Sequence, residues 1–185
     1  MPETPPPFTQ LSTKTLVENA WHRYCLDEYT HADGSIGKYY YIDHKGACGT
    51  IPLFEDGTTA IVRVHRYLLR RDLWEFPIGG QGKDTPLAAA QKELQEEAGL
   101  IAQRWDALGQ FAPYKGVATE TTYFFLARDL SWTEQELEPS EGITVHRMPL
   151  EEARARIVEQ ELGDGQSMAG LMLLDRFLAR ERDGS

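Results

Sequence analysis

The sequence has few cysteines, no long apolar run and no signal-peptide pattern. Only two cysteines, Cys25 and Cys48, occur among the 185 residues. A pair of cytosolic thiols is the simpler interpretation of them, and a single disulfide is the alternative. No apolar run is long enough to span a membrane, and the proline-rich residues 1–10 lack the apolar core of a signal peptide. These absences predict a cytoplasmic protein that does not enter a membrane.

Positive charge is also scarce. The chain has 19 Lys and Arg against 29 Asp and Glu, which gives a formal net charge of -10. Binding to a nucleic-acid backbone needs clustered Lys and Arg, so we expect no nucleic-acid partner. A small anionic ligand that binds together with metal ions is still compatible with this charge. The length suits one sizeable domain with a small N-terminal extension, and no internal repeat or linker requires a second one.

Hydrophobic periodicity predicts alternating strands and helices. Residues 2–7 are expected to form an extended, disordered tail, and residues 48–52 and 58–66 to pair as a hairpin. The other expected strands cover residues 19–27, 37–43, 103–111, 121–128 and 142–148, and the expected helices cover residues 87–98, 150–162 and 167–181. Mixed strands with flanking helices predict an α/β fold.

The most informative segment is a glycine-rich loop, residues 79–84, that leads into a helix. Thr85 suits the N-cap, Pro86 the first helical turn, and Gly99 the C-cap. At about 100° per residue, one face of this helix should be buried. The expected buried stripe is Leu87, Ala90, Leu94 and Ala98.

Three glutamates of this helix, Glu93, Glu96 and Glu97, follow the i, i+3, i+4 spacing and should lie close enough to share a divalent cation. Glu96 and Glu97 fall in the last helical turn, where the helix dipole disfavours carboxylates by about 0.3–1 kcal/mol each. Lys92 can offset part of this through an i, i+4 contact with Glu96. The alternative is a solvated acidic helix face, but the preceding glycine loop favours a metal site.

This pattern resembles the Nudix box. The family signature is a glycine, five residues, a glutamate, seven residues, then Arg-Glu-U-x-Glu-Glu-x-Gly-U, where U is aliphatic. Residues 93–100 match its second half at every specified position. Lys92 replaces the arginine, Asp84 replaces the first glutamate, and Gly79 lies one residue too close to Asp84, so the loop is one residue short. The resemblance implies a Nudix α/β/α sandwich with a mixed β-sheet and a small N-terminal β extension.

Further segments resemble the ADP-ribose and nucleoside diphosphate sugar pyrophosphatase branch of this family. They are residues 39–42, 58–64, 73–77, 108–111, 116–127 and 167–171. The branch implies hydrolysis of the pyrophosphate bond of ADP-ribose or another nucleoside diphosphate sugar, giving a nucleoside monophosphate and a sugar phosphate. One alternative is a hydrolase of another nucleoside diphosphate derivative, such as a dinucleotide. A second alternative is a non-catalytic sensor that binds ADP-ribose.

The resemblance also implies how the chain is divided. Residues 1–11 would be a disordered tail, residues 12–45 a strand region that contributes to a homodimer, and residues 46–185 the Nudix hydrolase domain. The expected partner besides the second subunit is a small-molecule nucleoside diphosphate sugar.

Hydrolysis of a pyrophosphate needs cations that neutralise the phosphates and activate water. Carboxylate oxygens suit Mg²⁺, with Mn²⁺ also possible. We assign Glu93 and Glu97 as the main ligands, and Glu96 as a ligand or a bridging catalytic group. By family resemblance, the backbone carbonyl of Ile78 also binds metal.

The general base of this branch tends to come from an acidic loop outside the box. Residues 131–141 fit this description, and Glu141 is the first choice among them. Glu120 is the second choice, at a position where the branch often has an acidic residue near the phosphates. The alternative for the loop is a solvated linker whose charges serve solubility.

Four residues are expected to bind substrate by resemblance to the branch. Trp21 resembles the aromatic residue that stacks on the nucleobase, and Arg23 lies beside it in the sequence. Arg66 resembles the arginine at the ribose-phosphate end, and Glu75 resembles a position near the substrate and the metals. As alternatives, Trp21 could be a core residue, and Arg66 and Glu75 could form a surface ion pair of about 0–1 kcal/mol.

Overall fold

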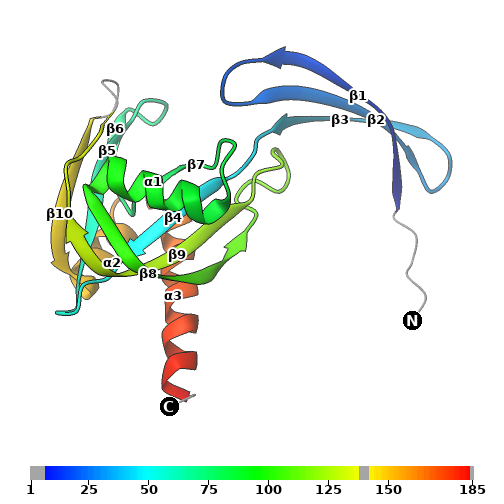
Figure 1. The fold of residues 1–185 in the computed structure, drawn as a ribbon. Helices are drawn as coiled ribbons and strands as arrows, with labels where there is room; N and C mark the ends of the chain where they lie inside the picture. Colours follow the sequence, from blue (N-terminus) through cyan, green and yellow to red (C-terminus); the bar gives the residue numbers. More distant parts are fainter. Residues whose placement is uncertain (1–6, 138–141, 184–185) are drawn as a thin grey trace. The chain divides into compact units, whose positions relative to one another are not determined.

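The structure is a computed structural model that describes residues 7–137 and 142–183. It divides into two compact units. Unit 1 contains Met1–Lys45 and Tyr114–Glu120, and unit 2 contains Gly46–Pro113 and Thr121–Ser185. Figure 1 shows the elements of both units.

Unit 1 is built on a three-stranded antiparallel sheet. Its strands are β1 (Phe8–Glu18), β2 (Arg23–His31) and β3 (Ile36–Asp43), paired in that order. Two predictions are wrong here. The expected tail of residues 1–11 overlaps β1, because Phe8, Thr9 and Gln10 pair with β2. The strand expected over residues 19–27 begins only at Arg23, because the side-chain oxygen of Asn19 accepts the N–H groups of Trp21 and His22 and forms a turn.

Unit 2 contains two sheets. The first has four strands in the order β7-β4-β9-β8, and it is mixed because β4 and β9 run parallel. Its strands are β4 (Ala47–Pro52), β7 (Ile78–Gly80), β8 (Leu100–Phe111) and β9 (Thr122–Trp132). The second sheet is antiparallel, with the order β10-β5-β6. Its strands are β5 (Thr58–Arg66), β6 (Arg71–Glu75) and β10 (Ile143–Pro149).

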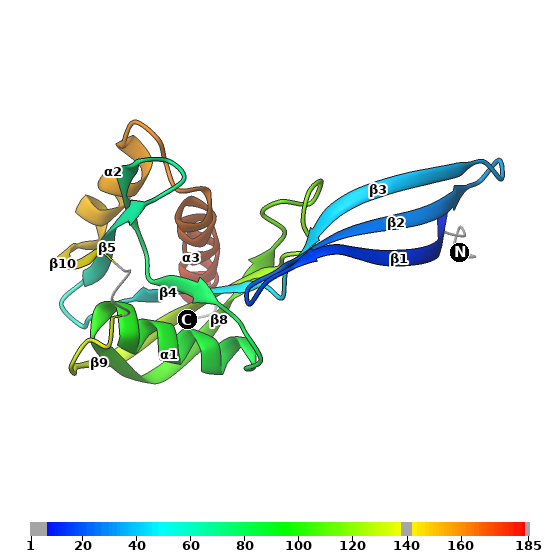
Figure 2. The same ribbon diagram turned by 90° about the horizontal axis from the view of Figure 1, so that it is seen from above.

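Three helices pack on these sheets. Helix α1 (Pro86–Ala98) and helix α3 (Gly165–Asp183) lie on opposite faces of the mixed sheet, and α2 (Leu150–Glu159) packs against the second sheet (Figures 1 and 2). The largest core cluster joins both sheets to α2 and α3, and a smaller one lies under α1. This arrangement of mixed sheet and flanking helices confirms the α/β fold class.

Three details of unit 2 correct the sequence predictions. Residues 48–52 and 58–66 do not form a hairpin, because they belong to different sheets and are joined by a single bridge, Leu53–Thr59. Strand β4 is buried along its whole length between β7 and β9, which is why β5 cannot pair with it. In α1, Leu87 is exposed, whereas Ala89 and Glu97 are buried. The short strands β6 and β7 were not predicted.

Candidate active site

Helix α1 begins and ends where its cap residues predict. The Thr85 hydroxyl accepts the N–H of Ala88 at 3.3 Å, and Pro86 occupies the first helical turn. Gly99 ends the helix in a left-handed conformation with φ of 60°. The short loop before the helix is closed by a turn in which the N–H of Asp84 and the carbonyl of Gln81 lie 3.2 Å apart. The loop therefore closes on itself although it is one residue shorter than in the family signature.

Glu97 is the most buried acidic residue of α1. It is only 6% exposed, and its Oε2 atom accepts the backbone N–H of Ile78 at 2.8 Å. A hydrogen bond from a backbone amide favours the charged carboxylate and fixes its orientation. The structure thus joins Glu97 to strand β7, whose carbonyl at Ile78 was the expected backbone ligand.

The side chain of Glu93 lies against Gly79, the residue that follows Ile78 in strand β7. A Cβ atom placed on Gly79 would lie 1.9 Å from Cδ of Glu93. Only glycine at position 79 therefore leaves room for this carboxylate. Glu93 and Glu97 reach the backbone of Ile78 and Gly79 from consecutive turns of one helix.

Glu96 has a different neighbour. Its carboxylate lies 3.3 Å from Nζ of Lys92, which confirms the expected i, i+4 contact. Within residues 7–137 and 142–183, no three His, Cys, Asp or Glu side chains converge into a group that could hold a metal ion by themselves. The structure therefore brings Glu93 and Glu97 to β7, but it does not gather all three glutamates on one point.

The oxygen atoms of Glu93, Glu97 and the backbone of β7 are suitable ligands for a hard divalent cation. Two carboxylates and a strand backbone offer only oxygen ligands, which Mg²⁺ and Mn²⁺ prefer, and Mg²⁺ keeps several waters when it binds. Cys48 pairs with Gly79 in the sheet. Burial, helped by the charge of Glu93, raises the pKa of its thiol to about 11. This thiol stays protonated near neutral pH, so it adds no soft thiolate ligand.

Arg66 and Glu75 form a partly buried ion pair across strands β5 and β6. The Nε atom of Arg66 donates to Oε1 of Glu75 at 2.7 Å, and a second guanidinium N–H donates to Oε2. Glu75 is 2% exposed, so the alternative of a surface pair is wrong for it. Burial raises the pKa of the Glu75 carboxyl, and Arg66 opposes part of that rise. The hydrogen bond to Glu75 raises the pKa of Arg66, and the charges of Glu97 and Asp164 add to the rise.

Asp164 and Ser167 complete this region and were not predicted as site residues. Oδ2 of Asp164 accepts the N–H of Ser167 at 2.7 Å and so caps the start of α3. The buried hydroxyl of Ser167 accepts the N–H of Phe76 at 2.9 Å. The start of α3 is thereby tied to the end of β6, next to Glu75. An aspartate three residues before a serine at a helix start was the available sequence signal.

Three other predicted site residues belong to unit 1. Trp21 is 78% exposed, so the alternative that it is a core residue is wrong. Arg23 donates from Nε to Asp43 at 3.1 Å, and this hydrogen bond lowers the pKa of the Asp43 carboxyl. Glu120 is 9% exposed and lies 3.7 Å from Nδ1 of His44. Glu141, the first choice for the base, lies outside the described residues.

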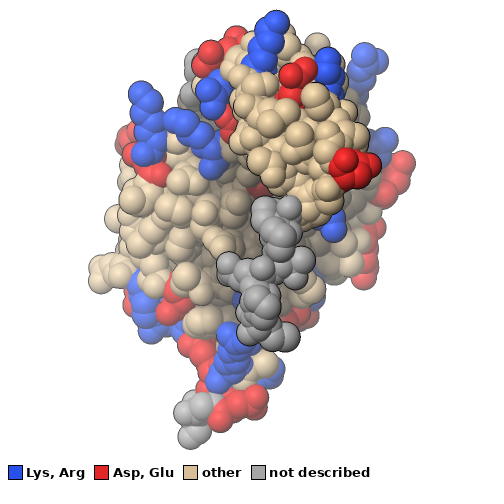
Figure 3. Space-filling view, turned by 90° about the vertical axis from the view of Figure 1, so that its right-hand side faces the viewer, with Lys and Arg blue, Asp and Glu red and all other residues tan. Residues whose placement is uncertain are grey.

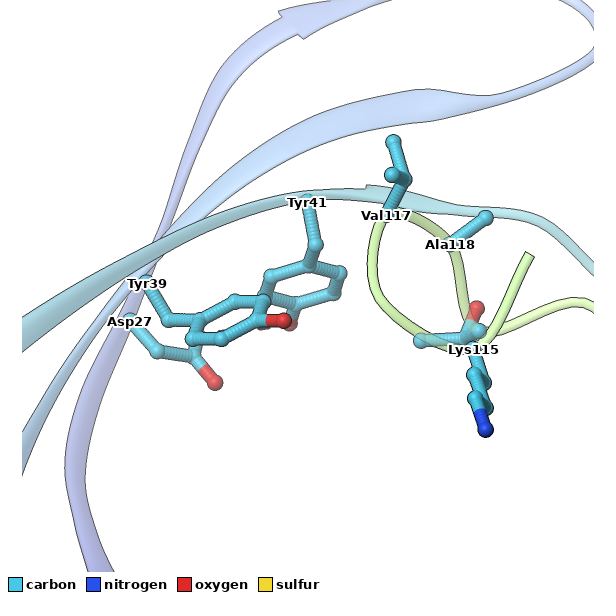
Figure 4. A pocket seen from close by; sticks show the side chains of 7 residues that line it. Asp27, Tyr39, Tyr41, Lys115, Val117 and Ala118 are labelled. Carbon is cyan, nitrogen blue, oxygen red and sulfur yellow. Dashed lines mark hydrogen bonds between the residues drawn. The ribbon is translucent and has the colours of Figure 1, made fainter.

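Unit 1 also contains a hollow of about 290 Å³ that was not predicted. Figure 4 shows the side chains of Tyr39 and Tyr41 projecting from β3 on the same side, toward the loop that carries Lys115. The Tyr41 hydroxyl donates to Asp27 at 3.2 Å, and the Tyr39 hydroxyl donates to the Gly116 carbonyl at 2.9 Å.

Comparison with known proteins agrees with this geometry. The chain is 27% identical over 170 residues to an ADP-ribose pyrophosphatase of Mycobacterium tuberculosis, an alignment that covers 89% of this chain and 82% of the relative. It is 29% identical over 145 residues to an ADP-ribose pyrophosphatase of Bacillus subtilis, covering 77% and 78% of the two chains. A solved structure described as an ADP compounds hydrolase has the same fold, with a TM-score of 0.80 at 16% identity over 97% of this chain and 98% of that chain.

The family match and these relatives identify a pyrophosphohydrolase. The family model of the NUDIX domain matches residues 44–168, and the chain belongs to the Nudix family. The predicted resemblance, including its ADP-ribose pyrophosphatase branch, is confirmed, and so is the prediction of an enzyme. Nudix hydrolases generally need divalent metal ions. No helix in the described part of the chain has the length and apolar character needed to cross a membrane.

Proposed function

We propose that this protein hydrolyses the pyrophosphate bond of ADP-ribose, or of a closely related nucleoside diphosphate sugar, with Mg²⁺ as its metal. One observation carries this proposal: Glu93 and Glu97 meet the backbone of Ile78 and Gly79 at the glycine loop. Two relatives that align over most of this chain, at 27% and 29% identity, are named ADP-ribose pyrophosphatases, which supports the choice of substrate.

The carboxylates of Glu93 and Glu97 would hold the cation, and the Ile78 carbonyl would supply a further oxygen ligand. The bound cation would neutralise phosphate charge and lower the pKa of a water molecule. The hydrogen bond from the Ile78 N–H holds Oε2 of Glu97 and so orients this carboxylate against strand β7. Glu96 would act after leaving Lys92, as a second ligand or as a group that orients water.

Arg66 and Glu75 are suited to the substrate. Part of the Arg66 side chain is exposed, at 42%, although Glu75 holds it through a two-pronged contact. A guanidinium fixed in this way can contact a phosphate or a ribose hydroxyl without losing side-chain entropy on binding. The charge of Glu97 also acts on Arg66, which supports placing this residue at the metal end of the substrate.

The proton acceptor is proposed to be Glu141, with Glu120 as the second candidate. Trp21 and Arg23 are proposed as contacts to the base end of the substrate. The high exposure of Trp21 leaves its ring free to stack on a flat ligand. Each of these roles is tested by a single substitution with kcat and KM measured separately, because a base affects mainly kcat and a stacking residue mainly KM.

We further propose a homodimer in which unit 1 meets a second copy of the chain. The three-stranded sheet has large apolar side chains exposed on every strand: Leu11, Val17, Tyr24, Ile36 and Tyr40. Figure 3 shows a face of the molecule where large areas carry no acidic or basic side chain. Exposed apolar side chains, such as these five, commonly mark interfaces where they form a contiguous patch. The two free thiols, Cys25 and Cys48, support a reducing compartment such as the cytoplasm.

The decisive experiment measures phosphate-containing products from ADP-ribose, other nucleoside diphosphate sugars, dinucleotides and nucleoside triphosphates. Each substrate is assayed with Mg²⁺ and with a chelator. We expect cleavage of ADP-ribose that stops with the chelator and falls more than about 100-fold in Glu97→Gln. Glu151→Gln, which changes an exposed glutamate on α2, is the matched control and should keep full activity. If the protein cleaves a dinucleotide in preference to ADP-ribose, the proposed substrate is wrong and the dinucleotide alternative replaces it.

A further inference from the structure

The segment after β9, which contains Thr133, Gln135 and Glu136, contacts the C-terminal end of α1. The N–H of Thr133 donates to the carbonyl of Gly99 at 2.8 Å, and the N–H of Glu136 donates to the carbonyl of Glu96 at 3.3 Å. The side-chain amide of Gln135 donates to the carbonyl of Glu97 at 2.6 Å. The segment therefore meets the backbone of the two residues in the last turn that carry carboxylates.

This turn needs hydrogen-bond donors from outside the helix. The last four carbonyls of an α-helix have no intrahelical partner, and the dipole makes this end negative. The last turn of α1 contains no basic residue. Donors from Gln135 and Glu136 are amides, so they satisfy the carbonyls of Glu97 and Glu96 without adding a cation. A lysine or arginine there would also pair with the glutamate carboxylates and compete with a metal ion.

The fit between the segment and the helix end is close. A Cβ atom on Gly99 would lie 2.9 Å from the carbonyl oxygen of Thr133 and 3.1 Å from Cγ of Gln135. On the other side of the contact, Nε2 of Gln95 lies 3.3 Å from Oε1 of Glu136. The helix end and the segment thus hold each other through both backbone and side-chain contacts.

We propose that Gln135 is a positioning residue for metal binding. It fixes the last turn of α1 through the Glu97 carbonyl, and so sets the direction in which the Glu97 side chain meets Ile78 and the divalent cation. Gln135 is exposed, and its side-chain amide contacts the backbone carbonyl of Glu97, so we assign its role to the backbone of that residue. The inference rests on the proposed function, because it assigns the metal to Glu93 and Glu97.

The test measures binding of Mn²⁺ to the full chain without substrate, by electron paramagnetic resonance of the free ion. Gln135→Met keeps the length of the side chain and removes its amide. Gln91→Met makes the same change at an exposed position on the same helix. We expect Gln135→Met to weaken Mn²⁺ binding about 10-fold, as is typical for loss of a group that orients a ligand, and Gln91→Met to leave it unchanged.

If Gln135→Met is poorly folded, a second variant tests the same contact. Gln95→Met removes the contact with Glu136 from the helix side, and it should weaken Mn²⁺ binding in the same direction by a smaller factor. Mn²⁺ affinity equal to that of the wild type, within about twofold, in a folded Gln135→Met protein overturns the proposal, even if its melting temperature falls. Failure of the wild type to cleave ADP-ribose would contradict the proposed substrate alone, because the Mn²⁺ comparison needs no turnover.

Discussion

Gly79 decides where the Glu93 carboxylate lies. The missing side chain at position 79 leaves the space that this carboxylate occupies, since an added Cβ would fall 1.9 Å from Cδ of Glu93. The glutamate side chain is long and flexible, so it can move away from an added methyl group at little cost in stability. The function of this glycine is therefore separable from the fold.

Gly79→Ala should weaken metal binding by displacing Glu93 while leaving the free energy of unfolding nearly unchanged. Loss of one well-placed carboxylate should raise the Mg²⁺ concentration for half-maximal activity by about 10-fold or more. Gly80→Ala is the matched control, because a Cβ atom at Gly80 meets no other atom within 4 Å. Metal titrations and urea unfolding of both variants check this. Equal metal requirements in the two would show that Glu93 is not a ligand.

Glu75 should make the free energy of unfolding depend on pH. Burial raises the pKa of its carboxyl above the ordinary value of 4.5. A carboxyl whose folded pKa is raised favours the folded state when it is protonated, and this stabilisation is lost as the pH rises through the folded pKa. Glu75→Gln stays neutral throughout. The difference in unfolding free energy, variant minus wild type, should therefore move in favour of the variant as the pH rises above about 4.5.

Urea unfolding of both proteins between pH 4 and pH 8 measures this difference. A difference that stays constant, or that moves in favour of the wild type, would mean that Arg66 offsets the whole cost of burying the charge. Glu151→Gln supplies the baseline for an exposed glutamate.

At the scale of elements, α1 connects the glycine loop, the mixed sheet and the segment after β9. Its first turn is set by Thr85 and its last by Gly99, whose φ is 60°. At that angle a side chain costs about 1–2 kcal/mol through steric contact with the backbone. Gly99 carries a second constraint, because Thr133 lies against it.

Gly99→Ala should therefore destabilise the protein by more than Gly57→Ala. Gly57 also has a positive φ, 77°, but an added Cβ meets nothing within 4 Å. The control should thus lose only the backbone cost of about 1–2 kcal/mol, and Gly99→Ala should exceed it because the segment after β9 must shift. Chemical unfolding compares the two. Equal losses would show that the contact between this segment and α1 adds nothing to stability.

At the scale of the whole molecule, the exposure of unit 1 supports the proposed homodimer. Among its described residues in the three strands, only Cys25 is buried. A three-stranded sheet without a covering helix has little core of its own. Among the described residues, the four core clusters all lie in unit 2. The family resemblance had implied that residues 12–45 contribute to a homodimer.

Sedimentation equilibrium should therefore find a dimer at micromolar concentration, and Tyr40→Lys should weaken it. Tyr40 is 51% exposed on β3, and a buried lysine at an apolar interface is costly. Ile101→Lys is the control, since Ile101 is similarly exposed, at 49%, but lies on β8 in unit 2. A wild-type chain that sediments as a monomer would sink the dimer proposal.

Helix α1, its caps and the spacing of its glutamates could be predicted from the sequence. These features follow from contacts within a few residues, such as Thr85 with Ala88 and Lys92 with Glu96, so the local pattern is sufficient to predict them. The bounds of strand β5, Thr58–Arg66, were also predicted, because an apolar run and the turn residues before it are local signals too.

The partners that these residues contact could not be predicted in the same way, because they lie far away in the sequence. Glu97 binds Ile78 from 19 positions away, and Ser167 accepts from Phe76 across 91 positions. The wrong hairpin has the same cause, since β4 pairs with β7 and β9 rather than with the strand that follows it. Pairings between distant segments depend on which surfaces the whole chain can bury together, and no local spacing encodes that choice.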